Sequence, residues 1–336
     1  MSDLREPDIE RLLAAFARRK HDRVPHFDFI DPGNVGAILG RDPAKCARND
    51  ALSGADAVRV AKATCMDFVL VSIQFWPGTT TPSGLVNGWA DLPAVRPVDT
   101  AAARWKVQDF LAASKGTKLG VGIDVAGPFF STYMSMGPVP IQSFMLALHD
   151  DRALVEELMD LQVERQIERV AAIADLPIAF VEIADDVCDN HGFMVEPALM
   201  ETLWVPRYLS VLRACQALGV PVMSHCCGKL DAVLPRLVEW GICAVSPVQP
   251  NCNDIYALGR TWGDRICLVG NISIQGVLAF GTPADVEVDV KEHIERLAGH
   301  GGYVVASSHS IVDAIPPANY RAMVAAVLKY GRYDGA

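Results

Sequence analysis

The sequence lacks two features that would direct a chain of 336 residues to a membrane or to nucleic acid. No apolar run is long enough to cross a bilayer, and the first residues, MSDLREPDIERLL, contain no apolar stretch of a secretion signal. Lys and Arg form no cluster suited to phosphates, and the formal net charge is -10. We therefore expect a cytoplasmic protein that binds neither membranes nor nucleic acid, and whose partner is a small molecule or another protein.

Two motifs of redox enzymes are also missing. None of the nine cysteines forms the CxxC spacing of thiol oxidoreductases, and their odd number, without an export signal, predicts that most are reduced. No GxGxxG follows the first strand-like run, which removes the best sign of an open dinucleotide-binding sheet. The role of the two adjacent cysteines in SHCCGKL, at 224–230, is therefore the main question that composition leaves open.

Eight short β-branched or apolar runs alternate with helical stretches. A helix is expected to begin at Pro283, with Thr282 as its N-cap. The alternation predicts a single (β/α)8 TIM-barrel domain over residues 1–336, with an N-terminal helical extension and a long insertion at 76–97 after strand two. An open doubly wound sheet is the alternative. The strand-like runs are 24–30, 67–73, 120–125, 178–186, 220–225, 242–247, 266–271 and 303–309.

Acidic residues stand at the ends of several predicted strands, where the active sites of such barrels lie. In the fourth run, alternation of side chains sends Glu182 and Asp186 toward the barrel interior. The same alternation adds Asp28 and Asp124. Because an interior carboxylate is unfavourable unless it is paired or metal-bound, we expect these acids to converge on one cavity. The alternatives are structural roles for Asp28 and Asp124, and a solvated loop position for Asp185 and Asp186.

The stretch SHCCGKL contains a candidate metal clip. In an extended strand end, residues two apart share a face, so His225 and Cys227 point together while Cys226 points away. Zinc suits such a pair and, in catalytic sites, takes about three protein ligands with one open position. His309, at the end of the last run, is the preferred third ligand, ahead of Glu182, Asp186 and Cys188. The alternative is a hydrogen-bonded core pair without metal.

Other residues near strand ends are candidates for substrate binding. Trp76 would form an apolar lid, and the flexible thioether of Met134 suits a bulky ligand. The alternatives are packing for Trp76, an exposed loop position for His191 and a turn for Asn271. Arg207 is expected to support the acidic cluster through a salt bridge. The full set of predicted substrate contacts is Asp28, Trp76, Met134, His191 and Asn271.

Three stretches carry a resemblance to a known family: DDVCDNHGFMVEPALMETLWVPRY, SHCCGKL and GNISIQGVLAFGTPADVEVDVKEHIERLAGHGGYVVASSHSIVDAIPPANYRAM. They resemble the uroporphyrinogen decarboxylase superfamily, and within it the methylcobamide:coenzyme M methyltransferase-like branch of zinc enzymes that exchange methyl groups with corrinoid proteins. The resemblance implies a (β/α)8 barrel and zinc bound by His225 and Cys227. It therefore favours the metal clip over the core pair.

The sequence departs from the family pattern at two places. The decarboxylases carry an RQAGRY-type segment whose arginines hold substrate carboxylates, whereas this chain reads RVPHFDFIDPGN. The thiol-methylating branch has a second cysteine near the last strand, where this chain has His309. A zinc ion that has one thiolate ligand fewer is a stronger Lewis acid. Such an ion suits the activation of a leaving oxygen.

The resemblance thus implies a zinc-dependent methyltransferase that takes a methyl group from a small, O-methylated donor. Glu182, Asp186 and Asp124 are the expected catalytic groups. The chain has no DxHxxG-type corrinoid signature, so cobalamin would arrive on a separate corrinoid protein. Family analogy favours a homodimer. A decarboxylase and a non-catalytic ligand-binding relative are the alternative functions.

Overall fold

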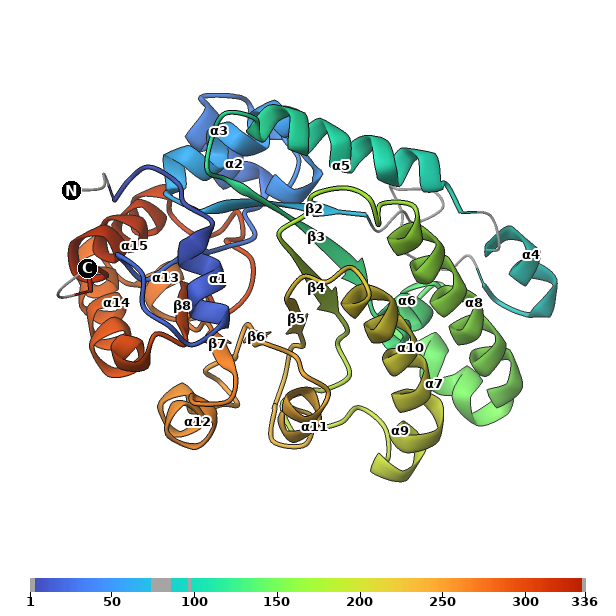
Figure 1. Cartoon of the computed structure of the whole chain (residues 1–336). Helices are drawn as coiled ribbons and strands as arrows, with labels where there is room; N and C mark the ends of the chain where they lie inside the picture. Colours follow the sequence, from blue (N-terminus) through green and yellow to red (C-terminus); the bar gives the residue numbers. More distant parts are fainter. Residues whose placement is uncertain (1–3, 74–85, 96–97, 334–336) are drawn as a thin grey trace.

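The computed structural model describes residues 4–73, 86–95 and 98–333 of the chain. Eight parallel strands form one curled sheet surrounded by helices, which confirms the predicted (β/α)8 architecture (Figure 1). Neighbouring strands follow the order β1-β8-β7-β6-β5-β4-β3-β2. The strands are β1 (His26–Phe27), β2 (Phe68–Ser72), β3 (Gly120–Ala126), β4 (Phe180–Ala184), β5 (Val222–His225), β6 (Ala244–Ser246), β7 (Cys267–Val269) and β8 (Tyr303–Ala306).

Helices cover the outside of the sheet, and the last two long ones, α14 and α15, pack side by side (Figure 1). Helix α14 begins at Pro283 as predicted, and Thr282 forms a capping box with Asp285. None of the described helices is both long and apolar enough to span a membrane. The helices are α1 (Glu10–Phe16), α2 (Pro32–Leu39), α3 (Gly54–Thr64), α4 (Leu92–Val95), α5 (Thr100–Ser114), α6 (Pro128–Met134), α7 (Pro140–Asp150), α8 (Arg152–Ala171), α9 (Pro197–Leu203), α10 (Val205–Gln216), α11 (Leu234–Glu239), α12 (Ile255–Trp262), α13 (Val277–Phe280), α14 (Pro283–Leu297) and α15 (Pro317–Tyr330), with 3-10 turns η1 (Pro43–Lys45), η2 (Asn49–Ala51), η3 (Trp89–Asp91) and η4 (Ala298–His300).

The two ends of the strand order, β1 and β2, meet through side chains. Within the described residues no strand ladder joins them, but the rings of Phe27 and Phe68 stack with centroids 5.1 Å apart. Strand β1 is shorter than the predicted run, because Oδ1 of Asp28 accepts the backbone N–H of Ser307 at 2.9 Å in place of a further ladder bond. Aromatic packing therefore closes the barrel at this seam.

Apolar side chains fill the barrel interior, and their placement follows the alternation along each strand. Phe180 of β4 points inward and meets Phe16 of α1 edge-on, with ring centroids 5.7 Å apart. Gly122 of β3 leaves room for this ring, since a Cβ there would lie 2.3 Å from it. Val181 and Ile183 instead belong to the core between sheet and helices. The alternation predicted for the fourth strand is therefore confirmed.

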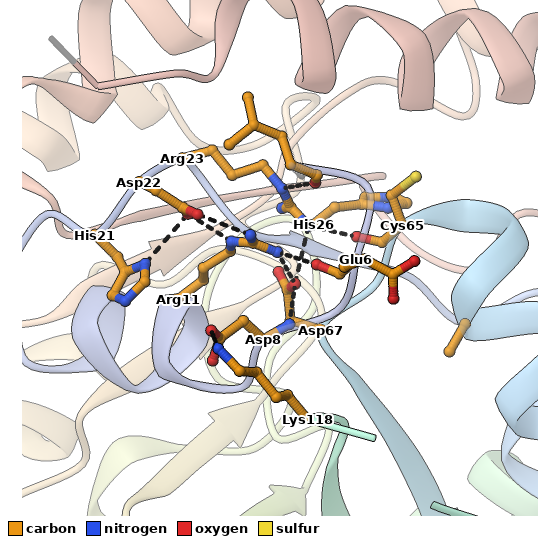
Figure 2. Close-up of polar contacts among 12 residues, drawn as sticks. Glu6, Asp8, Arg11, His21, Asp22, Arg23, His26, Cys65, Asp67 and Lys118 are labelled. Atoms are coloured by element: carbon orange, nitrogen blue, oxygen red, sulfur yellow. Dashed lines mark hydrogen bonds and ion pairs between the residues drawn. The ribbon is translucent and has the colours of Figure 1, made fainter. Parts of the chain in front are cut away.

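An ionic cluster lies at the N-terminal end of the barrel, beside α1 (Figure 2). One oxygen of Asp67, which precedes β2, accepts hydrogen bonds from Arg11 Nη1 and Arg23 Nη2, each at 2.9 Å. Arg11 also binds Asp22 through two N–H groups, at 2.5 and 2.8 Å. Arg11, Arg23 and Asp67 are at most 2% exposed. Their charges compensate one another inside the protein, so the cluster has a structural role.

Candidate metal centre

Strand β5 delivers two candidate metal ligands to the C-terminal end of the barrel. It ends at His225, and Cys227 follows in the loop. Nε2 of His225 and Sγ of Cys227 lie 3.6 Å apart. Cys226, between them, is 2% exposed and packs in the core between sheet and helices. The predicted geometry, with His225 and Cys227 together and Cys226 facing away, is confirmed.

The loop after β8 adds a third candidate ligand. The ring centroid of His309 lies 6.1 Å from that of His225. One ligand atom from each of the three side chains lies within 4.8 Å of the other two. In a tetrahedral zinc site with bonds of about 2.0–2.3 Å, ligand atoms are separated by roughly 3.4–3.8 Å, so a small inward movement of His309 would complete the set. Two imidazoles and one thiolate match the chemistry of a catalytic zinc site with one position left open.

Buried Glu182 orients the far side of the His225 ring. The hydroxyl of Ser246 lies 3.2 Å from Nδ1 of His225 and 3.2 Å from Oε1 of Glu182. Donation from Nδ1–H to the hydroxyl, and from the hydroxyl to the carboxylate, leaves the Nε2 lone pair beside Cys227. Outer hydrogen bonds of this kind orient histidines that bind metals. Among the described residues, Oε2 of Glu182 is buried without a hydrogen-bond partner.

Burial keeps both imidazoles neutral and the thiol protonated. It lowers the pKa of His225 to about 4 and also lowers the pKa of His309. Burial raises the pKa of the Cys227 thiol, and the carboxylate of Asp186 adds to this effect. Burial and the neighbouring Asp124 raise the pKa of Glu182. Neutral imidazoles offer the lone pairs that a metal needs, whereas the thiol must lose its proton when a metal binds.

The adjacent acids Asp185 and Asp186 have opposite environments. Oδ1 of Asp186 accepts the N–H of Cys227 at 2.8 Å and lies 4.0 Å from Nε2 of His225. Asp185 is 2% exposed, and burial raises its pKa to about 7. Its two oxygens accept the backbone N–H of Phe130 at 2.7 Å and the ring N–H of Trp204 at 2.8 Å. A solvated position for Asp185 is therefore wrong, because this carboxylate joins α6 to the start of α10.

The other two predicted acids differ in the direction of their side chains. Asp124 is buried on β3, directly opposite Glu182 in the strand register. Asp28 does not converge with them. Its Oδ2 lies 2.5 Å from Nε2 of His26, and its Oδ1 accepts the backbone N–H and the hydroxyl of Ser307. The expected convergence of Asp28 is wrong, because both of its oxygens are engaged by these two residues.

Two further predicted substrate contacts are engaged with the protein. Asn271 is 3% exposed, donates to the carbonyl oxygen of Val248 at 2.8 Å and is bound to Nε2 of His293 on α14 at 2.9 Å. Met134 ends α6 and packs partly against the core. The structure therefore does not bring the amide of Asn271 to the metal-ligand cluster.

Three predictions concern residues farther from the cluster. His191 lies in an exposed position of the loop after β4. Trp76 lies outside the described residues. Arg207 was expected to support the acidic cluster, but it binds Asp160 at 2.7 and 2.8 Å instead. This prediction is wrong because Arg207 lies on α10, whose outer face meets α8 rather than the barrel mouth.

Ser246, Phe29 and Arg48 lie near the metal-ligand cluster but were not predicted from the sequence as site residues. The Phe29 ring lies beside His225 with centroids 6.3 Å apart, and the Arg48 guanidinium lies 4.7 Å from the Phe29 centroid. Arg48 also binds Asp50 through two N–H groups, at 2.8 and 2.6 Å. No sequence motif marks these residues, because they come from strand β6 and from segments after β1 that only the closed barrel brings together.

Comparisons with known proteins agree with this arrangement. A family model described as uroporphyrinogen decarboxylase (URO-D) matches residues 87–330. The methylcobamide:CoM methyltransferase MtbA of Methanosarcina mazei is 24% identical over 343 residues, which cover 96% of this chain and 97% of that protein. A solved structure of a methyltransferase from Methanosarcina mazei has the same fold, with a TM-score of 0.69 and 19% identity over 97% of this chain and 99% of that one.

Proposed function

This chain belongs to the uroporphyrinogen decarboxylase family, and within it we propose a zinc-dependent methyltransferase that moves a methyl group from a small O-methylated donor to a corrinoid. The convergence of His225, Cys227 and His309 on one point carries this proposal. These residues come from two separate strand ends of the barrel, and no structural need of the fold requires two imidazoles and a thiol to meet there. Similarity to MtbA supports methyl transfer as the reaction class.

The three side chains supply the donor set that zinc prefers, and they leave one position for the substrate. Zinc held there would act as a Lewis acid on the leaving oxygen of the methyl donor. Two neutral imidazoles in place of thiolates favour this role, because they donate less charge to the metal. The short contact between His225 and Cys227 indicates that this half of the site is already formed.

The carboxylates around the ligands have separate roles in the proposal. Glu182 acts through Ser246 to hold His225 in the tautomer and orientation for metal binding. Asp124 lies opposite Glu182 in the strand register, and burial together with repulsion from Asp124 raises the pKa of Glu182, which limits the negative charge in the barrel. Asp186 is partly exposed beside the ligands, so among these acids it is the best placed to contact the methyl donor and to relay a proton from solvent to the departing oxygen.

The acceptor in this proposal is a reduced corrinoid, whose cobalt supplies the electron pair for the new bond to the methyl carbon. The name of the relative MtbA includes methylcobamide, which supports a corrinoid as one reactant. We propose that cobalamin is carried by a separate corrinoid protein, and that the chain works in the cytoplasm as a homodimer.

A decarboxylase is less compatible with the position of the arginine in the segment RVPHFDFIDPGN. Arg23 is 0% exposed and binds Asp67 at the opposite end of the barrel from His225 and Cys227. It therefore has no access to the carboxylates of a substrate at the barrel mouth.

Metal analysis combined with a donor panel tests the proposal. Purified protein should hold about one zinc per chain, and cob(I)alamin should be converted to methylcobalamin with an O-methylated donor, followed by absorbance. Cys227→Ser should lose both zinc and turnover, whereas Cys226→Ala, at the buried neighbour, should retain both. Full turnover by metal-free protein, or release of carbon dioxide without a methyl acceptor, would refute the proposal.

A further inference from the structure

A hollow of about 340 Å³ opens beside the metal-ligand cluster. The loops that follow β4, β6, β7 and β8 all contribute to it, so it lies at the C-terminal end of the barrel. His309 belongs both to the hollow and to the metal-ligand cluster. A molecule in the hollow therefore lies next to the candidate metal. Polar side chains that line the hollow include Asn190, Gln249, Asn251, Ser273, Gln275 and His309.

Hydrogen bonds hold several of the lining amides in place. Oε1 of Gln249 accepts the N–H of Gly228, the residue after Cys227, at 2.8 Å. Nδ2 of Asn251 donates to Oδ1 of Asn190 at 2.9 Å, which connects the loop after β6 to the loop after β4. Among the described residues, the side-chain amide of Gln275 and the NH2 group of Gln249 have no protein partner. The hollow thus offers the amides of Asn190, Gln249 and Asn251, which are held in position before a ligand arrives, together with the exposed amide of Gln275.

In the part of the chain that the structure describes, no Asp, Glu, Lys or Arg side chain lines the hollow. A charged ligand would find no opposite charge there, whereas a neutral ligand with amides would find both donors and acceptors. The volume is at the lower end of the range for small-molecule sites, so the hollow accommodates the edge of a large ligand. The rim of a corrin ring has this chemistry, because it bears uncharged acetamide and propionamide arms.

We infer that this hollow binds the amide arms of the corrinoid and thereby places its cobalt beside the metal centre. The inference rests on the proposed function and adds the location and recognition chemistry of the acceptor. The methyl donor would then approach beside Phe29, whose ring lies 6.3 Å from that of His225 and which does not line the hollow. Two reactants that meet at one metal need such separate approaches.

Binding of free methylcobalamin to variants of the hollow tests this inference. Gln275→Leu removes an exposed amide at similar side-chain size, and it should raise the Kd about three- to tenfold. Ser273→Ala, which removes only a hydroxyl, should have a smaller effect in the same direction. The matched control is Gln108→Leu on α5, an exposed position outside the hollow, which should leave the Kd unchanged. Titrations by tryptophan fluorescence use zinc-loaded and metal-free protein, so that binding is measured apart from turnover.

A second ligand and two further readouts separate the outcomes. A cobalamin monocarboxylate, with one amide arm hydrolysed to an acid, should bind the wild type more weakly than methylcobalamin does. Zinc content and the KM for the methyl donor should stay unchanged in Gln275→Leu. The inference would be overturned if Gln275→Leu left the Kd for methylcobalamin unchanged, or if it raised only the KM for the methyl donor. Methyl transfer and zinc binding by the same protein would in that case still uphold the proposed function. Protein that binds zinc but neither binds cobalamin nor methylates it would overturn both.

Discussion

The two ends of the barrel both gather polar side chains, but they differ in what those side chains bind. At the N-terminal end, one oxygen of Asp67 binds both Arg11 and Arg23, and Arg11 also binds Asp22 (Figure 2). Although burial opposes it, the hydrogen bonds to Asp22 and Asp67 raise the pKa of Arg11. Oδ2 of Asp67 is buried without a hydrogen-bond partner among the described residues, but no group of His, Cys, Asp or Glu ligand atoms converges there.

At the C-terminal end, the polar atoms converge but use only part of their bonding capacity on one another. The ligand atoms of His225, Cys227 and His309 face a common point, and buried Oε2 of Glu182 has no partner among the described residues. The difference teaches that charge content alone does not identify a site in this barrel. A site is recognised where the surrounding structure fixes the donors but leaves their bonding capacity open.

Removal of the central acid of the N-terminal network should have the largest effect. Asp67→Ala leaves two buried arginines without their shared partner, so the free energy of unfolding should fall by about 3–5 kcal/mol. Urea denaturation measures this. Asp175→Ala, which breaks an exposed pair with Arg104, should leave the free energy of unfolding nearly unchanged and serves as the control. If the two ends of the barrel are independent, the folded Asp67→Ala protein should retain its zinc. A loss of unfolding free energy in Asp67→Ala smaller than that in Asp175→Ala would contradict the structural role of the network.

Loss of the thiol at the C-terminal end should change zinc binding rather than folding. Cys227→Ser replaces a strong zinc ligand by a weak one, and zinc affinity should fall on the order of 100-fold. The unfolding free energy of the metal-free protein should change by less than about 1 kcal/mol, because Cys227 is only partly buried. Competition with a chromophoric chelator gives the affinity. Cys226→Ala should show the reverse pattern, a loss of stability with zinc retained.

The histidine after β8 should contribute less than the thiol but still act as a ligand. His309→Ala should weaken zinc binding at least about tenfold, and His309→Cys should restore part of the loss because thiolate is also a zinc ligand. Chelator competition again measures the affinity. Retention of wild-type zinc affinity together with loss of activity would show that His309 contacts the substrate only.

Zinc affinity should depend on pH through a single proton. Burial raises the pKa of Cys227, so the thiol is protonated in the metal-free protein, and zinc binding must release this proton. His225, whose pKa is lowered to about 4, is already neutral and releases none. Affinity should therefore rise about tenfold per pH unit between roughly pH 6 and 8 and fall as acid is added. Calorimetry in buffers of different ionisation enthalpy counts the proton, and a count near zero would contradict the protonated thiol.

Local sequence patterns predicted most strands of the fold and the orientation of the His225–Cys227 pair in the candidate metal site. Seven of the eight strand-like runs contain a strand of the structure, and the run 120–125 ends one residue before β3 does. The start of α14 was predicted from Thr282 and Pro283. The orientation of His225, Cys226 and Cys227 also followed from residue alternation alone. The predictions for Asp28 and Arg207 were wrong, because a polar residue near a strand end or on a helix can bind neighbours on either side. Alternation along a strand predicts which way a side chain points, but it does not predict which residue that side chain binds.

The sequence by itself determined the barrel and the His225–Cys227 pair, because both depend on periodicities of a few residues that the backbone geometry imposes. Only the tertiary structure decided that His309 reaches this pair, that Ser246 connects His225 to Glu182, and that polar side chains from four loops line one hollow. These contacts join residues from different strand ends, and their distances are set by the closure and stagger of the whole barrel. No local pattern encodes those distances, because closure is a property of all eight strands together.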